Sequence, residues 1–152
     1  MKNKNNICII NYGMGNIHSV YNPLNSLGFQ SFVTDNNEDL KKGDSFILPG
    51  VGAFSKAMSN LKNLNLIDEI NKQILIKKKN ILGICLGMQL LADFSEEGGI
   101  NSGLSFIPGN VLDLSNKIKI RVPHIGWNAL KMNNNNNLFK NIESGQEFYF
   151  VH

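Results

Sequence analysis

The sequence has 152 residues, of which 42% are hydrophobic and 18% are charged, with a formal net charge of +3. A chain of this length suits one domain and can bury most of its unfolded surface. No apolar run approaches the roughly 18 residues that cross a bilayer, and residues 1–6 do not resemble a secretory signal. The lysines are scattered without interleaved aromatic residues, so we expect neither a membrane nor a nucleic acid as a partner. A cytoplasmic location is therefore expected.

The chain begins with a strand, a glycine-rich turn and a helix. Residues 7–10 form a continuous apolar run, which is typical of a strand buried on both faces. Apolar residues then recur at helical spacing from Ile17 to Leu27. Pro23 falls inside this pattern, so we expect the helix to start late or to be kinked there.

The next elements are a strand, a short helix and another strand. Residues 29–34 predict the second strand, and Asp35 with Glu38 three residues later resembles a capping box for a short helix. Residues 45–48 predict a third strand, which ends at the turn formed by residues 49–52. An amphipathic helix, a fourth strand and a further helix are predicted around residues 66–74, 80–84 and 87–92.

This alternation predicts an α/β fold with a mostly parallel, doubly wound sheet and helices on both faces. The pattern changes after residue 99, where residues 104–114, 118–122 and 148–152 resemble strands without intervening helices. The asparagine run at residues 133–137 is expected at an exposed loop tip. We find no internal repeat and expect a single domain.

The strongest chemical motif is Gly83-Ile84-Cys85-Leu86-Gly87, which follows a strand and opens a helix. This is the cysteine form of the nucleophile elbow, in which a tight turn presents the nucleophile and flanking glycines let strand and helix approach closely. The backbone N–H of Leu86 would face a developing oxyanion, and one such donor typically contributes about 3–4 kcal/mol to transition-state stabilisation. The alternative is a buried cysteine between two packing glycines.

A second motif, Pro49-Gly50-Val51-Gly52, ends the preceding strand. In a parallel sheet its loop reaches the same carboxyl edge as the elbow, which is where ligands bind in open α/β sheets. Glycines at this point allow a backbone N–H to turn toward a substrate carbonyl. Taken alone, the motif could equally be a simple turn.

The remaining cysteine and the histidines have simpler interpretations. Cys8 lies within an apolar strand and is expected to be an inert core residue. A disulfide between Cys8 and Cys85 is not expected in a reducing compartment. His18 is interpreted as a surface residue, and three scattered histidines with two distant cysteines do not make a metal site.

Six segments in order along the chain resemble the class I, or triad-type, glutamine amidotransferases. They are residues 11–16, 48–54, 83–91, 95–99, 106–111 and 123–128. Together they are similar to the glutaminase subunits of imidazole glycerol phosphate synthase in histidine biosynthesis. The resemblance implies a class I amidotransferase-like (flavodoxin-like) fold.

The same resemblance implies a mechanism and its residues. Cys85 would attack the carboxamide of glutamine, form a glutamyl thioester and release ammonia. The oxyanion would be held by the N–H groups of Leu86 and, after a peptide flip, Val51. The positions that match glutamine-binding residues are Gly50, Gly52, Gln89 and His152. For Gln89 the alternative is an amide on the surface of the helix, one turn after the nucleophile.

The resemblance also implies a partner, a (β/α)8-barrel cyclase or synthase subunit that forms a heterodimer and receives the ammonia without its entering bulk water. Residues in partner-facing segments are Asn11, Asn16, His124, Trp127 and Asn128. The alternative for Trp127 is a core aromatic. Neither a cofactor nor a metal is implied.

One part of the family pattern is not matched. The catalytic base of the family is a histidine in a His-Pro-Glu segment, and His18, His124 and His152 all fall in other segments. We therefore expect residues 1–152 to be one amidotransferase domain that is incomplete at its C-terminus. Loss of such a base can cost on the order of 10⁶ in rate, so these residues alone are expected to show negligible turnover.

Three other functions stay open at this point. A paralogous subunit that amidinates a surface sugar would have nearly the same glutaminase sequence. A catalytically inactive scaffold subunit would fit the unmatched base. A different elbow-type cysteine hydrolase would share the Cys85 motif but would not explain residues 49–52 or 123–128.

Overall fold

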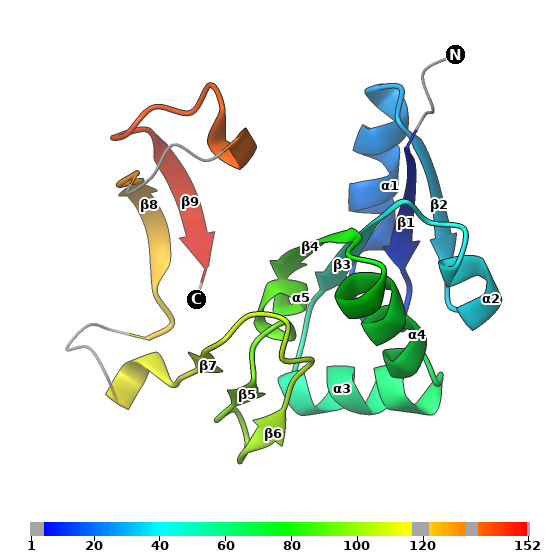
Figure 1. Ribbon diagram of the computed structural model, residues 1–152. Helices are drawn as coiled ribbons and strands as arrows, with labels where there is room; N and C mark the ends of the chain where they lie inside the picture. Colours follow the sequence, from blue (N-terminus) through cyan, green and yellow to red (C-terminus); the bar gives the residue numbers. More distant parts are fainter. Residues whose placement is uncertain (1–4, 117–121, 133–136, 152) are drawn as a thin grey trace. The chain divides into compact units, whose positions relative to one another are not determined.

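The computed structural model describes residues 5–116, 122–132 and 137–151 (Figure 1). It divides into two compact units, Met1–Leu112 and Asp113–His152, which are described separately. The prediction of a single domain over residues 1–152 stays a prediction. Within the described part of the chain, no helix is both long enough and apolar enough to span a membrane.

The first unit is built on a four-stranded parallel sheet. Its strands are β1 (Asn6–Ile10), β2 (Gln30–Thr34), β3 (Ser45–Gly50) and β4 (Asn80–Cys85), in the order β2-β1-β3-β4. The predicted parallel sheet is confirmed, and each predicted strand lies within a residue or two of its observed bounds. This strand order is that of flavodoxin-like doubly wound sheets, in which the chain reverses direction next to the first strand.

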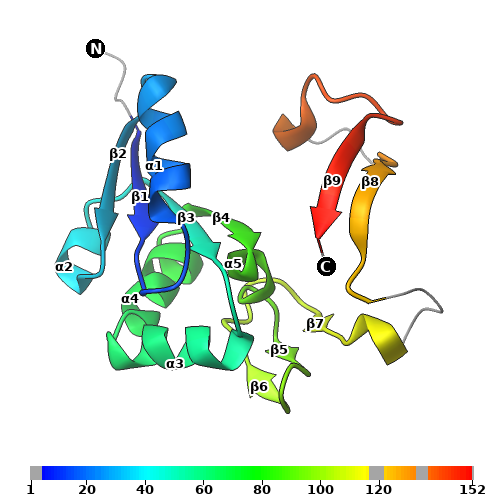
Figure 2. The ribbon, with the colours of Figure 1, turned by 180° about the vertical axis from the view of Figure 1, so that it is seen from behind.

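The helices of this unit are α1 (Ile17–Ser26), α2 (Asn37–Leu40), α3 (Phe54–Asn63), α4 (Ile67–Asn71), the π-helical η1 (Lys72–Ile76) and α5 (Leu86–Gln89). Crossovers between parallel strands are right-handed, so the reversal of direction places helices on opposite faces of the sheet. Figures 1 and 2 show α1 on one face and α4 on the other.

The core lies between the two inner strands and the helices α3 and α4. Cys8, Ile9 and Ile10 of β1 are fully buried, as predicted for a strand covered on both faces. Leu61 of α3 and Ile70 of α4 are buried on the same core. Each such side chain contributes roughly 1.5–3 kcal/mol when removed from water, so this layer holds β1 and β3 in place.

Helix α1 begins where the apolar spacing starts. Its first residue is Ile17, so the helix does not start late, and Pro23 lies inside it; the alternative of a kink at Pro23 stays a prediction. The Oδ1 atom of Asn16 accepts a hydrogen bond from the Ser19 N–H at 3.3 Å and caps the helix. Proline removes a single N–H donor from the helix. The Asn16 cap stabilises the first turn independently of that loss.

The N-cap of α2 lies one residue after its predicted position. Asn36, not Asp35, is the N-cap, and its Oδ1 accepts from the Glu38 N–H at 2.7 Å. Asn36 has the extended backbone that an N-cap requires, with φ −118° and ψ 132°. The capping box predicted for Asp35 with Glu38 is therefore wrong. Helix α3 was not predicted from the sequence.

Strand β3 runs two residues further than its predicted end and includes Pro49. Strand β1 pairs only with residues 45–47 of β3. Pro49 therefore has a neighbouring strand on one side only, which is β4. Proline is tolerated in a strand where no neighbouring strand needs its N–H. This extension brings Gly50 level with Cys85, which is the last residue of β4.

A small sheet follows α5. Its strands are β5 (Phe94–Ser95), β6 (Asn101–Ser102) and β7 (Asn110–Val111), in the order β6-β5-β7. The strand predicted over residues 104–114 is wrong except for β7. Leu104 and Phe106 instead donate their N–H groups to the carbonyls of Leu90 and Leu91, both at 2.8 Å. The carbonyls that follow α5 thus find hydrogen-bond partners outside the helix, as the end of a helix requires. Helix α5 therefore ends at Gln89 and does not reach the predicted residue 92.

The second unit contains a two-stranded antiparallel hairpin. Its strands are β8 (Ile125–Ala129) and β9 (Glu147–Val151). The 3-10 helix η2 (Leu114–Asn116) precedes β8, and the 3-10 helix η3 (Asn137–Phe139) lies in the connection between the two strands. The strand predicted over residues 148–152 is confirmed as far as Val151. Residues 118–121 of another predicted strand, and residues 133–136 of the asparagine run, lie outside the described residues.

Candidate active site

The two chemical motifs meet at the carboxyl edge of the sheet. Strands β3 and β4 are parallel, and Gly50 and Cys85 are partners in register at the ends of these strands. The turn at residues 51–53 and the elbow therefore start side by side. The predicted position of the Pro49–Gly52 motif beside the cysteine is confirmed.

Cys85 has the backbone of a nucleophile elbow. Its φ is 54° and its ψ is −119°, between the last residue of β4 and the first residue of α5. A non-glycine residue in such a sparsely populated region costs on the order of 1–3 kcal/mol, and it persists only where the surroundings impose it. The side chain is exposed, so the alternative of a buried packing cysteine is wrong.

Two glycines impose this turn by steric exclusion. A Cβ atom on Gly87 would lie 1.7 Å from the Leu48 carbonyl oxygen. A Cβ atom on Gly83 would lie 2.4 Å from the Cα atom of Met88. The first turn of α5 thus packs directly on the backbone of β3 and β4, which any larger residue at either position would prevent.

The backbone groups predicted to hold the oxyanion come from both sides of this contact. Leu86 is the first residue of α5, and the first N–H groups of a helix have no partner within it. Val51 is 59% exposed and lies between two glycines. Gly52 has φ 110°, which favours glycine, and a Cβ atom there would lie 2.8 Å from Met14 Cε. The structure therefore brings Val51 and Leu86 to the same edge as Cys85.

Glu97 is part of this region and was not singled out from the sequence. Its Oε2 atom accepts a hydrogen bond from the Phe54 N–H at 3.0 Å, across 43 residues of chain. Ala53, the N-cap of α3, supplies no side-chain cap of its own. Glu97 thus caps α3 and fixes the end of the turn at residues 51–53, and a carboxylate is favourable at a helix N-terminus. No local spacing in the sequence could indicate this contact.

The predicted glutamine-binding residues differ in their burial and in their position relative to Cys85. Gly50 is buried next to Cys85, and Gly52 is exposed in the adjoining turn. Gln89 is half-buried and lies one turn along α5 from Cys85, rather than fully on the helix surface. His152 lies outside the described residues.

Cys8 contrasts with Cys85 in its burial. It is completely buried in β1, and both cysteines are free thiols. Burial, with a smaller contribution from the negative charge of Asp39, raises the pKa of the Cys8 thiol to about 12. Only the thiolate is a strong nucleophile, so the prediction of an inert core residue is confirmed.

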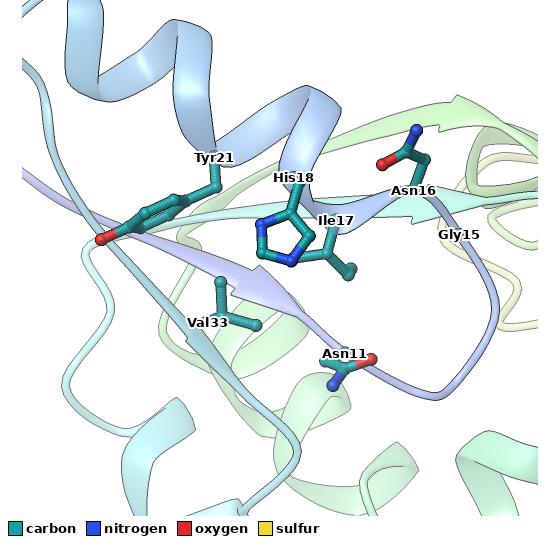
Figure 3. Close-up of a pocket in the computed structure, with 7 residues that line it drawn as sticks. All are labelled: Asn11, Gly15, Asn16, Ile17, His18, Tyr21 and Val33. Atoms are coloured by element: carbon teal, nitrogen blue, oxygen red, sulfur yellow. The ribbon is translucent and has the colours of Figure 1, made fainter.

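Asn11 and Asn16 border a pocket of about 430 Å³ between α1 and the sheet. Its lining residues are Asn11, Gly15, Asn16, Ile17, His18, Tyr21 and Val33. Figure 3 shows His18 and Tyr21 projecting from α1 toward Val33 on the sheet. Both asparagines also have local roles: Asn11 Oδ1 accepts from the Gly13 N–H at 3.2 Å, and Asn16 caps α1. His18 is exposed, as predicted.

The other predicted partner-facing residues belong to the hairpin of the second unit. Trp127 is 67% exposed in β8, so it is not part of a core within this unit, and its partner-facing role stays a prediction. Its ring meets that of Tyr149 edge to face, with centroids 5.6 Å apart. The Asn128 Nδ2 atom lies 3.1 Å from the His124 Nε2 atom. These contacts present an aromatic pair on the surface of the hairpin.

Among residues 5–116, 122–132 and 137–151, no group of three His, Cys, Asp or Glu side chains is placed to hold a metal ion.

Comparison with known proteins decides the family. The profile of the family described as glutamine amidotransferase class-I matches residues 8–152. The chain belongs to the class-I glutamine amidotransferases.

Several curated relatives of this amidotransferase share a name. The protein called imidazole glycerol phosphate synthase subunit HisH in Moorella thermoacetica is 46% identical over 146 residues, which are 96% of this chain and 68% of the relative. The Bacillus subtilis protein of that name is 44% identical over 150 residues, covering 96% of this chain and 70% of the relative. HisH 1 of Campylobacter jejuni is 43% identical over 146 residues, covering 96% and 73%.

A solved structure has the same fold. A chain described as glutamine amidotransferase superposes with a TM-score of 0.71 at 16% sequence identity, over 95% of this chain and 70% of that one. At this identity the likeness concerns the fold alone. It agrees with the predicted α/β architecture of the class I amidotransferases.

Proposed function

We propose that this amidotransferase hydrolyses glutamine to glutamate and ammonia, and that it is the glutaminase subunit of an imidazole glycerol phosphate synthase in histidine biosynthesis. The observation that carries the reaction is the exposed Cys85 thiol on a left-handed elbow, in register with Gly50. The names of the relatives at 43–46% identity support the pathway. They favour it over amidination of a surface sugar.

The reaction proceeds by acyl transfer to sulfur. The Cys85 thiolate attacks the side-chain carboxamide carbon, and the electron pair of the C=O bond moves to oxygen. The N–H groups of Leu86 and, after the Gly50–Val51 peptide turns, Val51 stabilise this oxyanion. Its collapse breaks the C–N bond, and the nitrogen takes a proton from water and leaves as ammonia. Water then hydrolyses the thioester to glutamate.

The substrate is held around this centre by residues from three segments. Gly50 and Gly52 offer backbone groups beside the elbow, and Gln89 offers an amide one turn further along α5. His152 is assigned to the same role from the sequence resemblance. Glu97 keeps the turn at residues 51–53 in place through its bond to the Phe54 N–H. Neither His18 nor His124 is assigned as the catalytic base, because neither falls in the segment that carries the base in the family pattern.

The partner is a barrel-type cyclase subunit, with which the protein forms a heterodimer in the cytoplasm. The pocket at Asn11 and Asn16 and the exposed Trp127 are surfaces that support this assignment. Aromatic residues are enriched at protein interfaces. The ammonia passes to the partner without entering bulk water.

The glutaminase site is tested by covalent labelling with 6-diazo-5-oxo-norleucine, an electrophilic analogue of glutamine. We expect stoichiometric labelling at Cys85, located by peptide mass spectrometry, and none at Cys8, which serves as an internal control. The variant Cys85→Ser should take up no label. If the reagent fails to modify Cys85 in folded protein, the proposed function is wrong.

A further inference from the structure

Tyr12 carries a hydroxyl group that the fold itself does not use. Its side chain is only 1% exposed, and its Oη atom has no hydrogen-bond partner among the described residues. An unpaired buried polar group destabilises the folded state by about 1–3 kcal/mol. A phenylalanine would fill the same space without that penalty. The hydroxyl therefore requires an explanation other than packing.

The hydroxyl lies directly against the candidate site. A Cβ atom on Gly50 would be 2.4 Å from Tyr12 Oη, and the same Cβ would be 2.8 Å from the Gly87 backbone nitrogen. Tyr12 Oη thus borders the residue that precedes Val51 and the first turn of the elbow helix. Burial, and to a smaller extent the negative charge of a Cys85 thiolate, raises the pKa of Tyr12 to about 12. At neutral pH the group is a protonated donor.

The phenol is held in this position from its backbone. The Asn60 Nδ2 atom donates to the Tyr12 carbonyl oxygen at 3.0 Å. Gly15, in the same turn, lies beside β3, and a Cβ atom on it would be in ordinary van der Waals contact with the Gly50 nitrogen at 3.5 Å. The Tyr12 side chain is therefore a fixed part of the site, whereas Val51 beyond it is exposed.

A turn of the Gly50–Val51 peptide creates a need for such a donor. When the Val51 N–H swings toward the substrate oxygen, the Gly50 carbonyl of the same planar peptide swings the opposite way. Gly50 is buried, and a buried carbonyl without a partner is costly. A fixed hydroxyl donor beside Gly50 removes that cost.

We propose that Tyr12 is a positioning residue for oxyanion stabilisation, and that its hydroxyl donates a hydrogen bond to the Gly50 carbonyl oxygen when the Gly50–Val51 peptide has turned. This inference rests on the proposed glutaminase function. Tyr12 touches neither substrate nor thiol in this role. It acts by favouring the conformation in which Val51 N–H faces Cys85.

Two probes of Cys85 separate this role from a structural one. Glutamate γ-semialdehyde forms a C–S bond with the thiolate while its C=O electron pair moves to oxygen, so its affinity depends on the oxyanion donors. Methyl methanethiosulfonate transfers a methylthio group to the thiolate and releases methanesulfinate, and it contains no carbonyl. The affinity for the aldehyde is read as protection of Cys85 against the second reagent.

We expect Tyr12→Phe to weaken the affinity for the aldehyde about fivefold, the factor that one net hydrogen bond contributes. Its rate of reaction with methyl methanethiosulfonate alone, and its melting temperature, should match the wild type or exceed it. The control Tyr149→Phe, which removes the hydroxyl of an exposed tyrosine in the hairpin, should change neither probe.

The outcomes are distinguishable. If the aldehyde protects the wild type and Tyr12→Phe equally, the role of Tyr12 is refuted and the glutaminase function stands. If Tyr12→Phe also reacts more slowly with methyl methanethiosulfonate, or has a lower melting temperature than the wild type, Tyr12 is structural and the inference is also refuted. If the aldehyde does not protect the wild type, the proposed function itself fails.

Discussion

The two cysteines show how differently the interior and the carboxyl edge of one sheet treat the same side chain. Cys8 lies within β1, fully buried, with a thiol whose pKa is raised to about 12. Cys85 is the last residue of β4, exposed, on a backbone turn with φ 54°. The strands that surround Cys8 supply rigidity, and the edge uses that rigidity to hold a strained turn. Reactivity is thus a property of position in the sheet rather than of residue type.

The largest effect is expected at Gly87, where the helix of the elbow packs on the backbone of the sheet. Gly87→Ala would place a methyl group 1.7 Å from the Leu48 carbonyl oxygen, and backbone cannot yield as a flexible side chain does. We expect a loss of about 3 kcal/mol or more in the free energy of unfolding, measured by urea denaturation.

The control for this change is Gly28→Ala. Gly28 has φ 78° but no atom within 4 Å of a built Cβ, so only the cost of the left-handed backbone, about 1 kcal/mol, should appear. Equal losses in the two variants would show that the contact between α5 and β3 does not hold the elbow.

The interior can be probed through the titration of Cys8. Because the folded state keeps this thiol protonated, with its pKa raised from 9.0 to about 12, its contribution to stability is complete below pH 9 and is lost as pH rises toward 12. Cys8→Ala should cost about 1–2 kcal/mol at pH 7. The free energy of unfolding of this variant should then fall less steeply than that of the wild type between pH 9 and 11.

Urea denaturation at several pH values measures this difference. Tyr12, whose pKa is also raised, remains in both proteins, so the comparison isolates Cys8. Parallel stability curves for wild type and variant in this pH range would mean that Cys8 is not held neutral by the fold.

A smaller effect is expected at the bond that fixes the turn at residues 51–53. Glu97→Ala removes the acceptor of the Phe54 N–H and should lower the free energy of unfolding by about 1 kcal/mol, the usual effect of losing a helix cap. It should also slow the labelling of Cys85 by 6-diazo-5-oxo-norleucine. The matched control Glu96→Ala changes the neighbouring exposed carboxylate and should alter stability by less than about 0.5 kcal/mol. Indistinguishable variants would argue against the cap.

Much of the fold and the elbow could be predicted because their signals are local. An apolar run predicts β1, and glycines two residues on either side of Cys85 predict a close strand–helix turn, which the steric contacts of Gly83 and Gly87 explain. The cap of α2 was predicted one residue early, because Asp35 and Asn36 are both good caps and only the observed backbone selects Asn36.

The errors and omissions arise from contacts between distant segments. Glu97 reaches the Phe54 N–H across 43 residues, and Tyr12 reaches Gly50 from the turn that follows β1. Residues 104–107 have a strand-like composition, yet their N–H groups bond to the carbonyls that end α5. A local sequence pattern does not indicate partners that are distant in the sequence, so these contacts can be recognised only in the folded structure.

The central claim is that Cys85 and the turn beside it form a site for the side-chain amide of glutamine. It is tested most directly by measuring how glutamine and asparagine slow the labelling of Cys85 by 6-diazo-5-oxo-norleucine. The account predicts that glutamine protects Cys85 in a saturable manner and that asparagine, one methylene shorter, protects far less. Equal protection by both amino acids, or none by glutamine, would contradict it.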